Sequence, residues 1–271
     1  MPEGNRAAVS YRDLISGFRS LDLGPERHVI AHASLSSFGD VRGGAETLLG
    51  ALQANVRGIM MPVFTSKPEI IPDVGPDDNA IEYGSGKSAN MMAEFFYPEM
   101  PADKIMGIVP EALRKLEGAQ RSTHPLLSFT GINAFEALTS QTLDEPLAPI
   151  KVLSQLDGWV LLIGVDQTTN TSIHYAEKLA GRKQFVRWAL TAEGVRQCPQ
   201  YPGCSNGFNA ISVHIASVTR QVEIGDAVIQ AIPLNDLIAT VKVLIETDRF
   251  ALLCSRPDCR RCNTIRRLQK A

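Results

Sequence analysis

Short apolar runs alternate along the chain with longer segments whose apolar residues recur at helical spacing. The runs that predict strands are residues 29–31, 59–64, 159–164, 184–188, 227–229 and 250–253. The segments that predict helices are residues 10–20, 44–54, 86–97, 103–116, 146–156, 172–180 and 234–247. The last of these follows Pro233 and carries its apolar residues on one face. This alternation of strands and helices predicts a layered α/β fold.

Two stretches depart from the amphipathic pattern. Residues 159–165 are apolar on both faces, which is typical of a central strand covered by helices on each side. Residues 66–86 instead contain Pro68, Pro72 and Pro76 and show little periodicity. Loops of this length tend to be functional or disordered. We expect this loop to form a lid or a substrate rim, the alternative being an insertion without a role.

The length of 271 residues predicts one domain over residues 1–271, with a cysteine-bearing C-terminal tail from about residue 254. The composition, 44% hydrophobic and 21% charged, is that of a globular protein. A net charge of −2 provides no field that attracts nucleic acid or an anionic membrane. Residues 158–165, the longest apolar run, are too few to span a membrane, and residues 1–6 precede no signal-like apolar segment. We therefore expect a cytoplasmic protein with neither a nucleic-acid nor a membrane partner.

The five cysteines are Cys198, Cys204, Cys254, Cys259 and Cys262. None lies in the first two thirds of the chain, so no disulfide framework spans the fold and a reducing compartment is expected. The C-x₂-C spacing near the C-terminus, with a distant pair, is compatible with a thiolate zinc site. Buried free cysteines are also common. Both interpretations stay open, and the sequence alone assigns no metal ligand.

A predicted strand over residues 29–31 runs into a turn rich in serine and glycine, and a helix follows from Ala45. Such a strand–loop–helix unit offers backbone N–H groups and hydroxyls to the phosphate or amide groups of a ligand. The turn matches neither the dinucleotide-binding G-x-G-x-x-G pattern nor the P-loop. A plain turn with serine caps is the alternative.

The segment Arg121-Ser122-Thr123-His124-Pro125 concentrates a cation, two hydroxyls and an imidazole. Pro125 biases the preceding residue toward extended geometry. This combination suits a phosphate or an oxyanion, although arginine and histidine also serve as donors that hold a loop in place.

A third segment follows the apolar strand that ends at Gly164. Ligands in α/β sheets lie beyond the carboxyl ends of strands. Thr171 is a candidate N-cap, which places His174 in the first helical turn and Glu177 three residues later on the same face. A histidine beside a carboxylate can act as a general base, because the carboxylate stabilises the imidazolium that forms on proton uptake. A capping histidine is the alternative.

Residues 203–207 match G-x-S-x-G, the nucleophile elbow of α/β hydrolases. That elbow needs a preceding strand, and the two prolines in residues 198–202 argue against one. His214 is the only later histidine, with no acidic residue between it and the motif. We therefore do not expect a hydrolase.

Taken together, several segments resemble the aminoglycoside 3-N-acetyltransferase family of antibiotic-modifying enzymes. The resemblance extends over roughly residues 10–255 and keeps the order of the family's motifs. The matching segments are His32-Ala33-Ser34-Leu35-Ser36-Ser37-Phe38-Gly39 with Gly43-Gly44, then residues 61–65, 106–114, 121–125 and 170–177.

The resemblance implies a three-layer α/β/α fold around a mixed β-sheet, unlike the histone-acetyltransferase-like fold. It also implies acetyl-CoA (coenzyme A) as the acetyl donor. By this resemblance, His174 is the catalytic base and Glu177 its acidic partner. The cofactor-binding residues that it implies are His32, Ala33, Ser34, Leu35, Ser36, Ser37, Phe38, Gly39, Arg121, Ser122 and His124.

The implied partner is a small-molecule amine, with aminoglycosides as the leading class. Aminoglycosides are polycations, so we expect a carboxylate wall formed by Asp73, Asp77, Asp78 and Glu82. Residues 78–84 also resemble family branches that acetylate other amines, including phosphonate antibiotics. The remaining alternative is a CoA-binding or zinc-stapled scaffold without turnover. A homodimer is compatible with the sequence.

Overall fold

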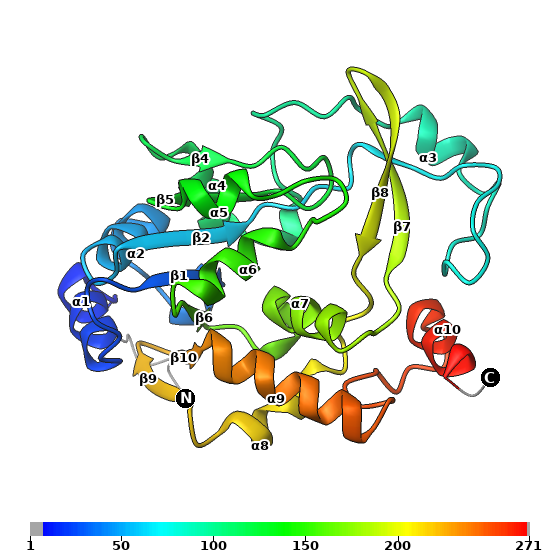
Figure 1. Ribbon diagram of the computed structural model, residues 1–271. Helices are drawn as coiled ribbons and strands as arrows, with labels where there is room; N and C mark the ends of the chain where they lie inside the picture. Colours follow the sequence, from blue (N-terminus) through cyan, green and yellow to red (C-terminus); the bar gives the residue numbers. More distant parts are fainter. Residues whose placement is uncertain (1–7, 270–271) are drawn as a thin grey trace, which may run out of the picture.

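A seven-stranded mixed sheet forms the centre of the computed structural model, which describes residues 8–269 (Figure 1). Its strand order is β4-β5-β2-β1-β6-β10-β9. β1 pairs in parallel with both β2 and β6, whereas the other pairings are antiparallel. The strands are β1 (His28–Ala33), β2 (Gly58–Pro62), β4 (Gln120–Arg121), β5 (Phe129–Ile132), β6 (Trp159–Ile163), β9 (Arg220–Ile224) and β10 (Ala227–Pro233).

Helices cover both faces of this sheet, and each face has its own hydrophobic core. On one face lie α1 (Tyr11–Ser20), α2 (Gly44–Gln53) and α4 (Ile108–Lys115). On the other lie α5 (Phe135–Thr139), α6 (Ala148–Gln155), α7 (Thr171–Leu179) and α9 (Leu234–Thr247). The three-layer α/β/α prediction is confirmed.

β6 shows why a strand without a polar face lies at the centre. All of its residues are buried, and alternate side chains enter opposite cores. Leu161 and Ile163 pack in the first core, and Val160 and Leu162 pack in the second. Because successive side chains of a strand point to opposite faces, a sheet covered on both sides needs apolar residues at every position.

A second, three-stranded sheet lies beside the first, in the order β3-β7-β8. In Figure 1 the β7–β8 hairpin projects beyond the central sheet. Its strands are β3 (Glu69–Ile70), β7 (Phe185–Thr191) and β8 (Gly194–Tyr201). The remaining helices are α3 (Lys87–Met91), α8 (Ser212–Ile215) and α10 (Arg260–Leu268), with short 3₁₀ helices at Leu35–Phe38, Lys104–Met106, Gln167–Thr169 and Phe208–Ile211.

Two predicted helices are longer in the sequence pattern than in the structure. The segment 86–97 is helical only in α3, and Met91 and Met92 at its end are exposed. The segment 103–116 divides at Gly107, where a φ of 87° ends a 3₁₀ turn before α4 begins. That φ lies in a region where glycine is the default residue, so the apolar spacing continues although the helix does not.

The strand predicted at 250–253 is wrong. These residues form a turn after α9, and Leu252 has a φ of 63°, which is incompatible with a strand. The expectation that no strand precedes the G-x-S-x-G segment is also wrong, since β8 contains Pro199. A proline is tolerated there because β8 is an edge strand of its sheet.

Among residues 8–269, none of the helices combines the length and the apolar character needed to cross a bilayer.

Candidate active site

The serine-rich turn leaves β1 at the edge of the sheet where its parallel neighbour β6 also ends. The Ser34 N–H donates to the Ile163 carbonyl at 2.9 Å, which joins the turn to the end of β6. Ser37 Oγ donates to the Ser34 carbonyl at 2.7 Å and occupies the space beside Gly164. A Cβ at Gly164 would lie 1.6 Å from this hydroxyl oxygen, and the φ of 64° there also requires glycine.

His32 connects this turn to the start of α7. Its side chain is buried, and Nε2 accepts the Thr171 N–H at 3.4 Å. Burial lowers the pKa of His32 to about 3, so the ring is neutral and can accept this bond at physiological pH. The N-cap of α7 is Asn170, one residue before the predicted Thr171, and its side chain accepts the Ser172 N–H at 3.1 Å.

His174 and Glu177 form a buried pair on α7. His174 Nδ1 lies 2.9 Å from Glu177 Oε2, and the side chains are 10% and 3% exposed. Since a carboxylate only accepts, Nδ1 is the donor in this bond, and the lone pair of a neutral ring then lies on Nε2. The pair therefore has the orientation of a general base with a supporting carboxylate.

Arg182, which follows α7, adds a cation to this pair, and no sequence motif pointed to it. Its Nε lies 3.4 Å from Glu177 Oε1, and its side chain is only 1% exposed. A second guanidinium nitrogen donates to the Ala251 carbonyl at 2.7 Å. The ring of Phe208 packs edge-on against His174, with 4.7 Å between the ring centroids. Glu177 thus interacts with His174 through one oxygen and with a buried cation through the other.

A cavity of about 1110 Å³ brings the first and third sequence motifs together. His174 lines it, together with His32, Ala33, Ser34, Leu35, Ser36 and Gly39. Ser37 and Phe38 of the same motif are not among its lining residues. Ser37 is used inside the turn, and Phe38 is buried in the core beneath α2.

The opposite wall comes from segments that sequence reasoning did not place at the site. The loop after β8 contributes Gly203, Cys204 and Ser205, and the C-terminal segment contributes Arg256 and Cys259. The G-x-S-x-G segment therefore lines the cavity, but no α-helix follows it directly, as a nucleophile elbow would require.

Arginines outnumber carboxylates among the residues that line the cavity. Four arginines line it, Arg187, Arg256, Arg260 and Arg261, against one carboxylate, Asp40. Burial lowers the pKa of Arg187 to about 10, which leaves the guanidinium charged at neutral pH.

The expected carboxylate wall lies elsewhere. Asp77, Asp78 and Glu82 line a separate hollow of about 520 Å³ beside α10, and Asp73 is exposed. Glu82 pairs with Arg260 at 2.7 Å, and Asp78 pairs with Arg267. Residue Ala80 is the part of the 66–86 loop that reaches the main cavity. Two of these four carboxylates are thus bound to arginines of α10.

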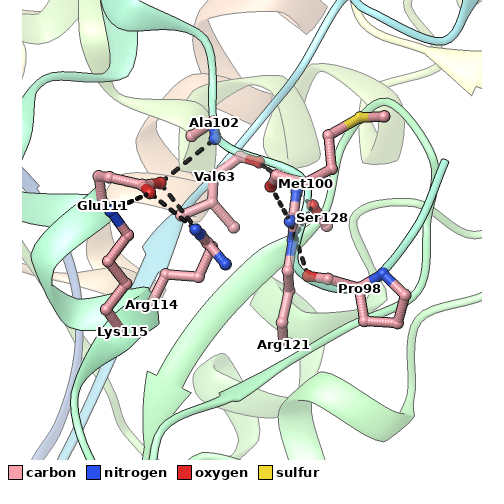
Figure 2. Close-up of polar contacts among 9 residues, drawn as sticks. All are labelled: Val63, Pro98, Met100, Ala102, Glu111, Arg114, Lys115, Arg121 and Ser128. Atoms are coloured by element: carbon pink, nitrogen blue, oxygen red, sulfur yellow. Dashed lines mark hydrogen bonds and ion pairs between the residues drawn. The ribbon is translucent and has the colours of Figure 1, made fainter. Parts of the chain in front are cut away.

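Arg121 is not among the residues that line the cavity. Figure 2 shows its guanidinium group held by polar contacts with neighbouring residues. Arg121 Nε donates to Ser128 Oγ at 3.0 Å, and the other nitrogens donate to the carbonyls of Val63, Pro98 and Met100. Burial lowers its pKa to about 10, so it stays charged while satisfying these acceptors. Arg121 therefore fixes the chain after β2 and the 98–100 loop.

Ser122 and His124 likewise bond to the backbone of their own loop. Ser122 Oγ accepts the Phe129 N–H at 2.8 Å, and His124 Nδ1 accepts the Leu127 N–H at 2.9 Å. Burial lowers the pKa of His124 to about 4, consistent with a neutral acceptor. Neither residue lines the cavity, although Leu127 does. The contact of this motif with the cofactor stays a prediction.

Comparison with known proteins places this geometry in a family. The family model described as Aminoglycoside 3-N-acetyltransferase matches residues 30–246, which contain most of β1, the serine-rich turn and α7. The chain belongs to this acetyltransferase family. The resemblance seen in the sequence motifs is thereby confirmed.

Individual members show the extent of the similarity. Aminoglycoside N(3)-acetyltransferase VII of Streptomyces paromomycinus is 35% identical over 190 residues, 66% of this chain and 64% of that protein, which is slightly under two thirds. Aminoglycoside N(3)-acetyltransferase IX of Micromonospora chalcea is 33% identical over 215 residues, 74% and 73% of the two chains. The crystal structure of apo aminoglycoside acetyltransferase AAC(3)-IVa has a TM-score of 0.78, with 22% identity over 97% of this chain and 99% of that chain.

Proposed function

We propose that this acetyltransferase transfers the acetyl group of acetyl-CoA to an amine of an aminoglycoside. The observation that carries the proposal is the His174–Glu177 pair at a cavity that the serine-rich turn also lines. The names of the similar proteins from Streptomyces and Micromonospora support the substrate class. The two motifs lie 140 residues apart in the sequence, so their meeting at one cavity is a property of the fold.

The size and lining of the cavity support a site for a large cofactor. Its volume of about 1110 Å³ lies just above the roughly 300–1,000 Å³ that ligand pockets usually enclose. Ser34 and Ser36 offer hydroxyls at the turn, and the arginines on the opposite wall can bind phosphates. When bound, acetyl-CoA supplies the activated thioester carbonyl.

The chain's own residues then perform proton transfer and charge stabilisation. An amine that arrives protonated must lose a proton before it can attack a carbonyl. His174 Nε2 accepts that proton, and Glu177 stabilises the imidazolium through Nδ1. Donors of the Ser34–Ser37 turn stabilise the negative charge that develops on the carbonyl oxygen. Transfer is direct, with no acyl-enzyme: the C–N bond forms, the C–S bond of the thioester breaks, and the sulfur leaves as the CoA thiol with the proton that His174 accepted.

The test is the variant His174→Ala, assayed by thiol release with kanamycin- or gentamicin-type drugs. Removing a general base lowers kcat by about 10²–10⁴-fold, while the CoA dissociation constant measured by calorimetry stays within about threefold. The matched control is His214→Ala, since His214 is an exposed histidine on α8 outside the cavity lining. Undiminished turnover in His174→Ala would remove this assignment.

A second candidate acceptor is an amine that also carries an acidic group, such as an amino-phosphonate. The observation that favours it is the excess of arginines over carboxylates in the cavity lining. Three of these arginines also face a carboxylate, Arg187 at Glu69, Arg256 at Asp258 and Arg260 at Glu82. The support for an anionic acceptor is therefore the guanidinium donors themselves, which bind phosphonate and carboxylate oxygens, and not a net positive field. Thiol release across a panel of aminoglycosides and amino-phosphonates separates the two candidates. Turnover confined to one class selects that class.

A further inference from the structure

Four of the five cysteines meet at one place, although they come from three separate segments. Cys204 follows β8, Cys254 lies after α9, and Cys259 and Cys262 lie at the start of α10. Their sulfur atoms all lie within 4.8 Å of one another. The fifth cysteine, Cys198, packs instead in a small apolar cluster of β8 with Leu126, Leu127 and Ala189.

The spacing of these sulfurs is that of ligands around one ion. Zn–S bonds of about 2.3 Å in a tetrahedron place the sulfurs about 3.8 Å apart. Four thiols held within 4.8 Å need only a small contraction to reach that geometry. We propose that Cys204, Cys254, Cys259 and Cys262 bind one structural Zn²⁺ that fixes the C-terminal segment against the wall of the cavity.

The local backbone also suits thiolate ligands. The Asn206 N–H points to Cys204 Sγ, with 3.5 Å between nitrogen and sulfur. Cys259 is the N-cap of α10, and Cys262 lies in its first turn, where the helix dipole favours negative charge. The C-x₂-C pair and the two single cysteines thus form the four-thiolate set that structural zinc sites use.

The surrounding charge is also complementary. One Zn²⁺ with four thiolates carries a net charge of −2, and arginines surround the cysteines in the sequence and in space. Arg266 donates to the Cys254 carbonyl, and Arg261 donates to the Gly203 carbonyl at 3.1 Å. Arg256 and Arg260 lie between or beside the ligand positions. Arg261 and Arg266 thus place positive charge beside the thiolates, whereas Arg256 and Arg260 are paired with Asp258 and Glu82.

The proposed ion would hold the basic wall of the cavity in place. Cys204 and Cys259 both line the cavity, as do Arg256, Arg260 and Arg261. The loop after β8 and the C-terminal segment are already in contact, because a Cβ at Gly207 would lie 2.4 Å from the Leu252 carbonyl oxygen. Without a cross-link, a helix as short and basic as α10 buries few residues against the rest of the fold. A metal joining three segments supplies that cross-link.

Elemental analysis of the purified full-length chain is the direct test. After dialysis against metal-free buffer, we expect one zinc per chain and no significant iron. In denaturant, a thiol reagent should react with four more thiols per chain after a chelator has removed the zinc than before. Zinc far below one per chain, stoichiometric iron with visible absorption, or disulfides among these four cysteines in intact-mass analysis would each overturn the proposal.

Variants localise the site. Cys259→Ser should lose most of the zinc, whereas the matched control Cys198→Ala should keep it, because Cys198 lies outside the cluster. If Cys259→Ser fails to fold, Co²⁺ exchanged into the wild-type chain provides a second measurement. Tetrahedral thiolate ligation then gives strong visible bands. Equal zinc loss in both variants, or Co²⁺ without such bands, contradicts the assignment.

Thermal stability and proteolysis test the structural role of the ion separately from its presence. Removing zinc from the wild-type chain should lower Tm by about 5 °C or more and increase proteolysis within residues 250–269. The metal content is measured without any substrate, so it stays informative even if the proposed acetyl acceptor is wrong. A chelator-treated chain with unchanged Tm and unchanged proteolysis would refute the cross-linking role.

Discussion

The substitution Glu177→Gln separates the two interactions of the buried carboxylate on α7. The glutamine oxygen can still accept the His174 Nδ1–H, so the ring orientation is kept. What is lost is the negative charge, which faces His174 at 2.9 Å and Arg182 at 3.4 Å. We expect two effects. The fold becomes less stable because Arg182 loses its counter-charge, and the reaction becomes slower because His174 loses the charge beside it.

The loss of stability is dominated by Arg182. Two charges 3.4 Å apart attract each other by ~5 kcal/mol at an effective dielectric constant of about 20. Burial lowers the pKa of Arg182, and the carboxylate of Glu177 acts in the opposite direction. Removing one partner of a buried pair typically costs about 3–5 kcal/mol; because Arg182 keeps its bond to Ala251, we expect about 3 kcal/mol and a Tm lower by about 6 °C.

The loss of activity is dominated by His174. Without the carboxylate charge, the imidazolium that forms during proton transfer is less stable, and kcat should fall by about 10²-fold. CoA affinity should not change, because Glu177 does not line the cavity. The assays are steady-state thiol release, calorimetry with CoA and thermal unfolding of the same preparation.

A second substitution decides whether the activity loss is a consequence of instability. In Glu177→Gln/Arg182→Met both buried charges are gone, so stability should recover while kcat stays low. Glu145→Gln is the matched control, since Glu145 pairs with Lys178 of the same helix at the surface. Activity that returns with stability in the double variant, or a kcat within threefold of wild type in Glu177→Gln, would refute the supporting role of Glu177.

Two further predictions concern the frame around the cavity. Gly164→Ala should displace Ser37 and the serine-rich turn, because its Cβ would lie 1.6 Å from Ser37 Oγ. We expect CoA binding, measured by calorimetry, to weaken at least tenfold. Unchanged affinity would refute a role of the turn in binding. Partial burial raises the pKa of Glu111, but hydrogen bonds from Arg114 and Lys115 outweigh this and hold it at about 2, below its ordinary 4.5 (Figure 2). The stabilisation of the fold by the ionised Glu111 carboxylate is therefore present above pH 4.5 and lost as the pH falls toward 2. Glu111→Gln should lower the unfolding free energy by about 1–2 kcal/mol at pH 7, measured by urea titration. The difference between variant and wild type should narrow below pH 4.5. A gap that stays constant with pH would contradict the ion-pair explanation.

Periodicity predicted the elements whose environment is uniform. β6 is apolar throughout because both of its faces meet a core, and α9 has a continuous buried face of Leu234, Leu237, Val241 and Ile245. Periodicity failed where one backbone angle decides the structure. Gly107 interrupts 103–116, and Leu252 turns the chain within 250–253, although both stretches keep a regular apolar pattern.

The residues of the candidate site likewise differ in whether the sequence alone could assign them. Spacing alone placed His174 and Glu177 on one helical face, because the relation i,i+3 is local. Arg182 could not be assigned, since its role depends on how the chain returns after α7 and on the Ala251 carbonyl. The Arg121 motif contains groups that suit a phosphate, but its charge is satisfied by three backbone carbonyls from distant loops. Composition identifies such groups without showing which partner satisfies them.

The proposed function assigns proton transfer and acceptor binding to different parts of this fold. The serine-rich turn and the helix with His174 follow β1 and β6, which pair in parallel at the buried centre of the main sheet. The facing wall comes from the second sheet, the loop with Cys204 and the C-terminal segment. Arg260 lines that wall and also pairs with Glu82 of the 66–86 loop. Replacing Arg260 would therefore remove a positive charge from the cavity lining and leave the Glu82 carboxylate without its partner. We expect such a change to alter the preference for the acceptor without moving His174 or Glu177.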